Sequence, residues 1–313
     1  MAKKITCNIC KHNKDFNFAV EKNGYRILEC PSCGIYFVHP QPSEDDLKKI
    51  YSFDKDYFKY DDFNKNNLPE FLEKRLKDLS DGDIYGKKFL DVGCGIGQAV
   101  FFAEQMGYDA LGLEINDGSI EKMKKKGISV INSTLEDFNG EKGSFDAIYL
   151  GDIIEHVKNP SGFLDKCYFL LKGGGKLLIA TPNANSFIAK YQFFIDKLFG
   201  IPWGHISPPH HLFEFSNTNL TNLLKSKKFK VEKVEFATSS FPYSVGNTGL
   251  FKKFKKEWRA SGSFLKALKN NNFGNNILLV AVITLFYSGY LLDKFLDNFY
   301  GGGNAMTVLA AKK

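Results

Sequence analysis

The residues of this chain best suited to chemistry form a loop in which three glycines, Gly93, Gly95 and Gly97, alternate with other residues. Apolar residues before the loop predict a buried strand, and the residues after it predict a helix. Glycines in such a turn permit positive φ values and let a ligand approach the backbone amides at the helix N-terminus. The next predicted strand ends at Glu114, nineteen residues after Gly95, where a carboxylate can bind the two hydroxyls of a ribose. The pattern predicts a site for a cofactor that contains a nucleoside.

An acidic residue, Asp91, stands at the start of this loop. Dinucleotide-binding folds favour G-x-G-x-x-G, because a pyrophosphate lies against the helix N-terminus, and a carboxylate would repel that group. It suits a ligand that carries an ammonium or sulfonium group. Here the chain resembles the class I S-adenosylmethionine-dependent methyltransferases, and four further segments follow in the order of that family. These are STLEDF (133–138), GSFDAIYLGDIIEHVKNP (143–160), LLKGGGKLLIATPN (170–183) and KKFKVEKVE (227–235).

The resemblance implies S-adenosylmethionine as the cofactor and assigns its contacts. Glu114 would bind the ribose, and Ile115 would lie against one face of the adenine. Two further residues would meet the adenine edge, and two at the end of the fourth predicted strand would lie beside the methyl group. The adenine-edge residues are Thr134 and Leu135, those beside the methyl group are Gly151 and Asp152, and the loop around the amino-acid part consists of Asp91, Gly93, Cys94, Gly95 and Gly97.

Three histidines are candidates for catalysis. Methyl transfer from a sulfonium is an in-line displacement in which the enzyme positions the acceptor and often removes its proton, and histidine titrates near neutral pH. His210 and His211 lie in a proline-rich loop between the fifth predicted strand and a helix that begins near Ser216. We expect His211 to be the general base and His210 to orient or replace it; the alternative is a pair of loop histidines hydrogen-bonded for structure. The pair His211–Leu212 resembles an active-site His-Leu pair of zinc-bearing sugar methyltransferases.

The third candidate, His156, follows the fourth predicted strand together with Asp152 and Glu155. In ubiquinone-type O-methyltransferases a similar cluster of acidic residues and histidine is associated with a divalent cation. The alternative that we favour is that Glu155 and His156 cap and orient the next helix, because this pair recurs in family members of many chemistries.

Four cysteines near the N-terminus have the spacing of a zinc ribbon. Two C-x-x-C pairs are separated by nineteen residues, and the segment between them predicts a hairpin with Asn23–Gly24 as its turn. A structural Zn²⁺ ion would supply the folding energy of so short a ribbon; the alternatives are two disulfides or free thiols. The ribbon resembles that of methyltransferases acting on sugars and on glycan or lipid precursors, where it would either close over the substrate or cap the domain. The expected ligands are Cys7, Cys10, Cys30 and Cys33.

These elements predict an α/β protein with a seven-stranded Rossmann-like methyltransferase sheet, mostly parallel with an antiparallel last strand, a small N-terminal zinc ribbon and a helical insertion before the last strand. The apolar stretch 277–292 of the insertion would be about 24 Å long as a helix, against about 30 Å of hydrocarbon in a bilayer. We therefore expect either a helix in the membrane interface, with peripheral contact through residues 250–296, or a buried lid or dimer helix. The predicted domains are the ribbon (1–42), a helical linker or substrate-side cap (43–85), the cofactor-binding methyltransferase domain (86–240), the insertion (241–303) and the last strand (304–313).

Composition narrows the function further. The chain has 313 residues and a net charge of +7, and only three of its 42 basic residues are arginines. Nucleic-acid binders tend to use arginine on phosphates and bases, so a nucleic-acid partner is disfavoured. No apolar segment follows Met1, and we expect a cytoplasmic protein, or one peripheral on the cytoplasmic face of the membrane. The predicted function is methylation, on oxygen by preference, of a small or lipid-linked acceptor, a sugar or glycan intermediate; the alternatives are an RNA methyltransferase and a non-catalytic cofactor-binding partner protein.

Overall fold

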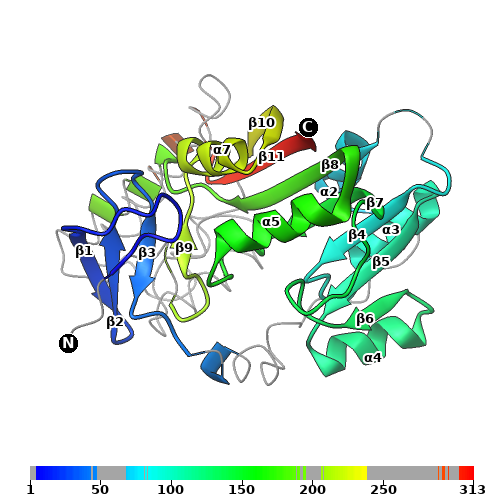
Figure 1. Ribbon diagram of the computed structural model, residues 1–313, viewed down its shortest axis with the longest axis horizontal. Coiled ribbons are helices and arrows are strands. Elements are labelled where there is room, and N and C mark those ends of the chain that lie inside the picture. Colours follow the sequence, from blue (N-terminus) through cyan, green and yellow to red (C-terminus); the bar gives the residue numbers. More distant parts are fainter. Residues whose placement is uncertain are drawn as a thin grey trace, which may run out of the picture. The chain divides into compact units, whose positions relative to one another are not determined.

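The computed structural model describes part of the chain, drawn in colour in Figure 1. The described residues are 5–43, 45–47, 68–80, 82, 84–187, 189–190, 193–194, 206, 208–237, 288, 291–292, 295 and 303–313. Most of the predicted interfacial segment 250–296 and of the linker 43–85 therefore lies outside the described residues. None of the helices in the described ranges is long and apolar enough to cross a membrane. The chain divides into one compact unit of Met1–Pro182, Pro208–Glu235 and Met306–Lys313, and another of Asn183–Ser207 and Phe236–Ala305.

The larger sheet has seven strands (Figure 1). In spatial order they are β10 (Phe229–Ala237), β11 (Ala305–Lys312), β8 (Leu171–Pro182), β7 (Phe145–Gly151), β4 (Lys88–Val92), β5 (Asp109–Glu114) and β6 (Val130–Asn132). Neighbouring strands from β8 to β6 pair in parallel, and the chain's last strand, β11, is the antiparallel one. The predicted fold class is confirmed, and the predicted last strand is present.

Helices follow the parallel strands because each crossover must return the chain to the same edge of the sheet. Apolar side chains of α2 (Glu70–Leu79), α3 (Gln98–Met106) and α4 (Asp117–Lys125) form one buried cluster with inward residues of the strands, such as Phe89. The neighbouring strand residue, Leu90, points to the opposite face and is also buried. Burial on both faces is typical of a parallel sheet covered by two helical layers.

Two further helices begin at side-chain caps that the sequence makes recognisable. The side chain of Asn159 accepts a hydrogen bond from Gly162 N at 3.1 Å at the start of α5 (Pro160–Leu170). Ser216 and Asn219 form a reciprocal capping box at the start of α7 (Asn217–Ser226), as the prediction of a helix near Ser216 required. The prediction that Glu155 and His156 cap the helix after the fourth strand of the domain is wrong, because Asn159 performs that role.

The smaller sheet contains the cysteine segment. Its strands, in spatial order, are β1 (Asn17–Lys22), β2 (Tyr25–Glu29), β3 (Tyr36–His39) and β9 (Phe213–Glu214). The predicted hairpin turn is confirmed, with positive φ angles of 54° at Asn23 and 78° at Gly24, as a tight turn between antiparallel strands requires. The fourth strand, β9, comes from the histidine loop and begins 174 residues after the end of β3, and the sequence did not predict this pairing.

Candidate active site and cysteine cluster

The glycine loop folds tightly onto the end of β5. Gly93 N and Cys94 N both donate to Leu113 O, at 2.8 and 3.0 Å. Gly93 has a φ of 67°, and a Cβ atom added there would lie 2.2 Å from Cδ1 of Ile153. Gly97, at φ 80°, is the N-cap of α3 and leaves no side chain between the loop and the first turn of the helix. The loop therefore needs glycine at these positions for both backbone angle and space.

Glu114 organises this loop through its carboxylate. Oε2 accepts from Gly95 N at 2.8 Å, while Oε1 accepts from Ile115 N and Asn116 N at 2.7 and 2.8 Å. A carboxylate has about four acceptor positions, so three hydrogen bonds leave one position, on Oε2, for a hydroxyl of a ribose. The predicted ribose contact remains a prediction, but the side chain is fixed at the mouth of the loop, where that role needs it.

Asp91 is buried in β4 beneath the same loop. Burial, together with the nearby charge of Glu114, raises the pKa of its carboxyl to about 8. A positively charged ligand would favour the ionised form, so binding of such a ligand is linked to loss of a proton from Asp91. The pair Asp91 and Glu114 thus suits a cation and disfavours a pyrophosphate, as predicted from the sequence.

The remaining predicted cofactor residues differ in burial and in the contacts of their side chains. Cys94 is buried, with Sγ 3.6 Å from the sulfur of Met123, and burial raises the pKa of its thiol; it packs as a small apolar residue. Thr134 uses its hydroxyl locally, donating to Asp137 Oδ2 at 3.0 Å and accepting from Asp137 N at 3.1 Å. Leu135 is buried, whereas Ile115 is half-buried and keeps part of its side chain accessible.

At the end of β7, Gly151 and Asp152 stand beside two residues that the sequence analysis did not include. Asp152 has a φ of 54°, rare for a residue with a side chain, and its amide donates to Ala180 O at 2.9 Å. Tyr149 is buried and receives a hydrogen bond from Arg75 of α2 at 2.9 Å. Burial raises the pKa of the Tyr149 hydroxyl to about 12, so it stays protonated. A helix assigned to the linker region thus supplies a cation to this end of the sheet.

The histidines predicted for catalysis come together on the same side of this site. The rings of His156 and His211 lie edge to face, with centroids 4.8 Å apart. His156 Nδ1 lies 2.8 Å from the main-chain oxygen of His210; because a carbonyl only accepts, Nδ1 carries the hydrogen and Nε2 is left with a lone pair. Burial, together with the positive charge of His211, lowers the pKa of His156 to about 3, so this ring is neutral.

His211 is paired with Glu214. Its Nδ1 lies 3.0 Å from Oε1 of Glu214, a side chain that is only 1% exposed, while 22% of the His211 side chain remains exposed. Burial lowers the pKa of His211, but the hydrogen bond and charge of Glu214, with the charges of Glu155 and Asp152, outweigh it and raise the pKa above the ordinary value. A carboxylate on Nδ1 fixes the tautomer with a free Nε2, which is the arrangement of an oriented general base.

The sequence analysis missed Glu214 and assigned the orienting role to His210. In the structure His210 contributes its carbonyl to His156, and Glu214 contributes the hydrogen bond to His211. The signal that could have identified Glu214 is that it is the only acidic residue between Pro208 and Ser216.

Glu155 is the third member of the cluster that contains His156 and His211. Thr181 Oγ1 donates to its Oε2 at 2.9 Å, while Oε1 has no hydrogen-bond partner among the described residues and lies 3.8 Å from His156 Nε2. Burial and the charge of Asp152 raise the pKa of this carboxyl. One ligand atom each from Glu155, His156 and His211 lie within 4.8 Å of one another. This set can hold either a shared proton or a divalent ion, since both histidines have the outer hydrogen bond typical of metal ligands.

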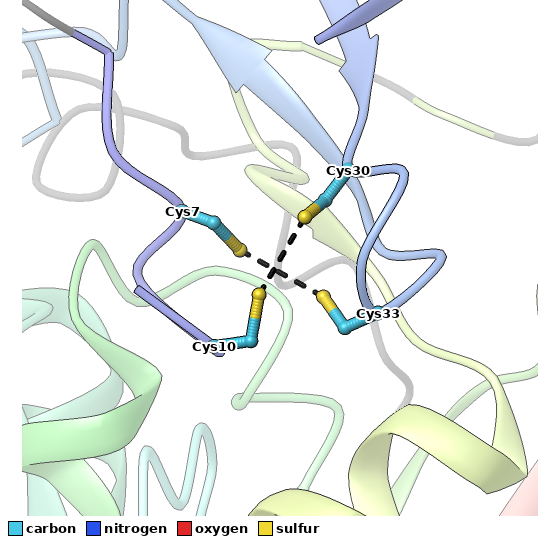
Figure 2. Close-up of side chains that lie close together, drawn as sticks. All are labelled: Cys7, Cys10, Cys30 and Cys33. Atoms are coloured by element: carbon cyan, nitrogen blue, oxygen red, sulfur yellow. Dashed lines mark hydrogen bonds between the residues drawn. The ribbon is translucent and has the colours of Figure 1, made fainter. Parts of the chain in front are cut away.

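The four cysteines of the smaller sheet converge on one point (Figure 2). Their sulfurs are 3.8 Å apart for Cys7 and Cys33 and 3.6 Å apart for Cys10 and Cys30, and none forms a disulfide. A tetrahedron with metal–sulfur distances of about 2.3 Å has edges of about 3.8 Å, so the donor set fits Zn²⁺. The hydrogen bond from the Cys33 thiol lowers the pKa of Cys7 to about 5.

Comparison with known proteins agrees with this geometry. The profile of the methyltransferase domain family matches residues 64–234, more than half of the chain. The chain belongs to this methyltransferase family. The family and the fold support S-adenosylmethionine as the cofactor of the methyltransferase.

Named relatives of the methyltransferase are ubiquinone biosynthesis O-methyltransferases. The protein from Vibrio parahaemolyticus is 31% identical over 177 residues, covering 51% of this chain and 72% of that one. The protein from Shewanella pealeana is 31% identical over 115 residues, 34% of this chain and 49% of the relative, so the match spans about half of its length. Among solved structures, a SAM-dependent methyltransferase from Archaeoglobus fulgidus is 17% identical with a TM-score of 0.48, covering 86% of this chain and all of that one.

Proposed function

We propose that this methyltransferase transfers a methyl group from S-adenosylmethionine to a hydroxyl group of a small or lipid-linked acceptor. The observation that carries the proposal is the His211–Glu214 pair, which supports an imidazole Nε2 free to accept a proton. Ile153 touches Gly93 of the cofactor loop and directly follows Asp152, so the cluster at Glu155 and His156 continues from the residues expected beside the methyl group.

The bound cofactor would supply an electrophilic methyl group on a positively charged sulfur. Asp91 and Glu114 would neutralise the positive charge of the cofactor, and the backbone amides of the loop would orient it. His211 would accept the acceptor's hydroxyl proton at Nε2 as the new oxygen–carbon bond forms and the carbon–sulfur bond breaks. Glu214 would stabilise the imidazolium that results. His156, neutral and with only 10% of its side chain exposed, would shape the acceptor pocket and hydrogen-bond through Nε2.

Two acceptor classes follow from different observations. The relatives' names, ubiquinone biosynthesis O-methyltransferase, support O-methylation and an acceptor from quinone biosynthesis. The ribbon resemblance supports a sugar or glycan intermediate, for which the relatives give no further support. Peripheral contact with a membrane through residues 250–296 is part of the lipid-linked version of either proposal.

A second mechanism is favoured by one specific observation. Oε1 of Glu155 is buried without a hydrogen-bond partner in the described part of the chain and faces His156. A divalent ion bound by Glu155, His156 and His211 would satisfy it, and would lower the pKa of a coordinated acceptor hydroxyl in place of a general base. The two mechanisms differ in their metal requirement, because a free base needs no divalent ion at this cluster.

The direct test measures release of S-adenosylhomocysteine with a panel of phenolic, quinol and sugar acceptors, alongside calorimetric binding of the cofactor. His211→Gln should reduce kcat by at least a hundredfold while leaving cofactor affinity within about twofold. His210→Gln should retain most of the activity, because the structure uses the main chain of His210 for the bond to His156. Cofactor binding without turnover on any acceptor, unchanged by either substitution, would favour the non-catalytic alternative.

The divalent-ion mechanism is distinguished from the base mechanism by adding Mg²⁺ or Mn²⁺ to protein that retains its ribbon metal. Activity that depends on the added ion, and that is lost in Glu155→Gln, would replace the base mechanism with the metal mechanism. Activity indifferent to added ions would leave His211 as the base.

A further inference from the structure

The segment that carries His211 is held from two sides. On one side, Leu212 N and Phe213 N both donate to the carbonyl oxygen of Glu155, at 2.8 and 3.1 Å. On the other side, Val38 N of β3 donates to Leu212 O at 3.0 Å, and Phe213 is in register with Phe37. The base therefore lies between the methyltransferase sheet and the cysteine ribbon, within one compact unit.

A side chain of the ribbon makes a second connection. Nδ2 of Asn23, in the hairpin turn, donates to Pro208 O at 2.8 Å, and this bond joins the turn to the beginning of the histidine segment. The first cysteine turn makes a bond of its own to the methyltransferase domain, from Asn8 Nδ2 to Lys158 O at 2.8 Å, but it does not reach the histidine segment. Asn8 thus attaches the ribbon to the methyltransferase domain, whereas Asn23 attaches it to the segment that carries His211.

The second cysteine turn leads directly into the strand that holds the base. Cys30 N donates to Ile35 O at 2.9 Å and Gly34 N donates to Cys30 O at 2.8 Å, and β3 begins three residues after Cys33. Phe37 stacks on Phe213, with centroids 6.5 Å apart and planes 28° apart. A metal ion that fixes Cys30 and Cys33 therefore fixes the start of β3.

The strand that pairs with β3, β9, is too short to be stable alone. β9 is two residues long, and β3 is its neighbour in the smaller sheet; a strand of this length has no stability without a partner. The ribbon segment is also too short to hold a core without a metal or another staple.

We propose that the cysteine ribbon is a positioning element of the active site: metal bound by its cysteines orders β3, β3 orders β9, and β9 places His211 and Glu214. The link from this order to turnover rests on the proposed function of His211. Loss of the metal should reduce turnover while leaving cofactor affinity unchanged, because the hydrogen bonds that order the glycine loop and Glu114 are made within the methyltransferase domain.

The test compares Asn23→Gly with Asn8→Ala in the full, zinc-loaded chain. Glycine accepts the φ of 54° at position 23 without strain, so this change deletes the bond to Pro208 and keeps the turn. Asn23→Gly should lower kcat by about three- to tenfold, because the loss of one hydrogen bond lowers the fraction of molecules in which His211 is correctly placed. Its zinc content and cofactor Kd should be unchanged. Asn8→Ala should leave kcat within about twofold.

Hydrogen exchange gives a readout independent of activity. The amides of Leu212 and Phe213 should exchange faster in Asn23→Gly and faster still after zinc is removed with a chelator, while the amides of Gly93 and Gly95 keep their protection. If the wild type transfers no methyl group to any acceptor, the proposed function fails, and the exchange data still decide whether the ribbon orders this segment. Unchanged exchange at residues 211–214 after zinc removal, or equal loss of kcat in both asparagine variants, would overturn the proposal.

Discussion

Replacing Glu214 by glutamine tests the base assignment at its most specific contact. The substitution keeps the size of a fully buried side chain and removes its charge, so the hydrogen bond to His211 Nδ1 becomes one between neutral groups. Hydrogen bonds to charged groups contribute about 1.5–3 kcal/mol and neutral ones about 0.5–1.5 kcal/mol. The difference of about 1–2 kcal/mol corresponds to about a five- to thirtyfold loss in the proton affinity of the imidazole.

The sign of the effect follows from the role of the base. His211 must be unprotonated to act, so the rate rises with pH through its pKa, which Glu214 holds above the ordinary histidine value. In Glu214→Gln the acid side of the kcat/KM profile should move toward lower pH. The maximum rate should also fall, because a weaker base accepts the proton less readily.

The assay is the pH profile of methyl transfer under cofactor saturation, combined with an NMR titration of the histidine rings. Glu232→Gln is a matched control: it removes a carboxylate that pairs with Lys176 on the sheet, away from the histidines. An acid limb that stays in place in Glu214→Gln, or that moves upward, would refute the argument that this carboxylate tunes the base. A profile that depends on added Mg²⁺ would point instead to the divalent-ion mechanism.

Three further predictions concern the cofactor loop and the insertion. Because Asp91 has a pKa of about 8 and must ionise to meet a cation, cofactor affinity should rise by up to tenfold per pH unit as pH approaches 8. Calorimetry across this range should show that Asp91→Asn binds the cofactor more weakly and with an affinity that does not depend on pH. Gly93→Ala should destabilise the fold by about 1–3 kcal/mol and weaken cofactor binding, because the new Cβ meets Ile153. The control Gly127→Ala has a similar positive φ but open space around the added Cβ, so a denaturant melt should show only the cost of the backbone angle. If residues 250–296 contact lipid, the protein should float with anionic liposomes at low salt; absence of co-migration with and without salt would argue for the lid or dimer-helix alternative.

The backbone geometry of the glycine loop could be predicted from the sequence because its information is local. A buried strand, a glycine turn and a capped helix are adjacent in the chain, and the carboxylate of Glu114 lies at the end of the next strand. Each residue there depends on backbone geometry that its own type encodes, such as positive φ at Gly93 and Gly97. The same is true of the cysteine pairs and of the Asn23–Gly24 turn.

The histidine cluster depends on contacts between distant segments. The pairing of β3 with β9 joins residues 36–37 to residues 213–214, and a two-residue strand has too short a pattern to be recognised from periodicity. Glu214 was overlooked for that reason, since only the tertiary fold turns it toward His211. Helix capping by Glu155 and His156 was the wrong alternative because Asn159, a stronger N-cap residue, follows three positions later.

The charges of the cofactor site and of the histidine cluster can be related by following where positive charge would move during methyl transfer. In the proposed mechanism, methyl transfer would remove a positive charge from beside Asp91 and Glu114 and, through proton transfer from the acceptor, would create one on His211. Glu214, Glu155 and Asp152 all raise the pKa of His211, and they would therefore stabilise the charge that this reaction creates there. Burying several carboxyl groups close together is costly for a fold, even where each of them has a hydrogen bond. A reaction that ends with the His211 imidazole protonated, as we propose, would explain why these carboxyl groups surround it.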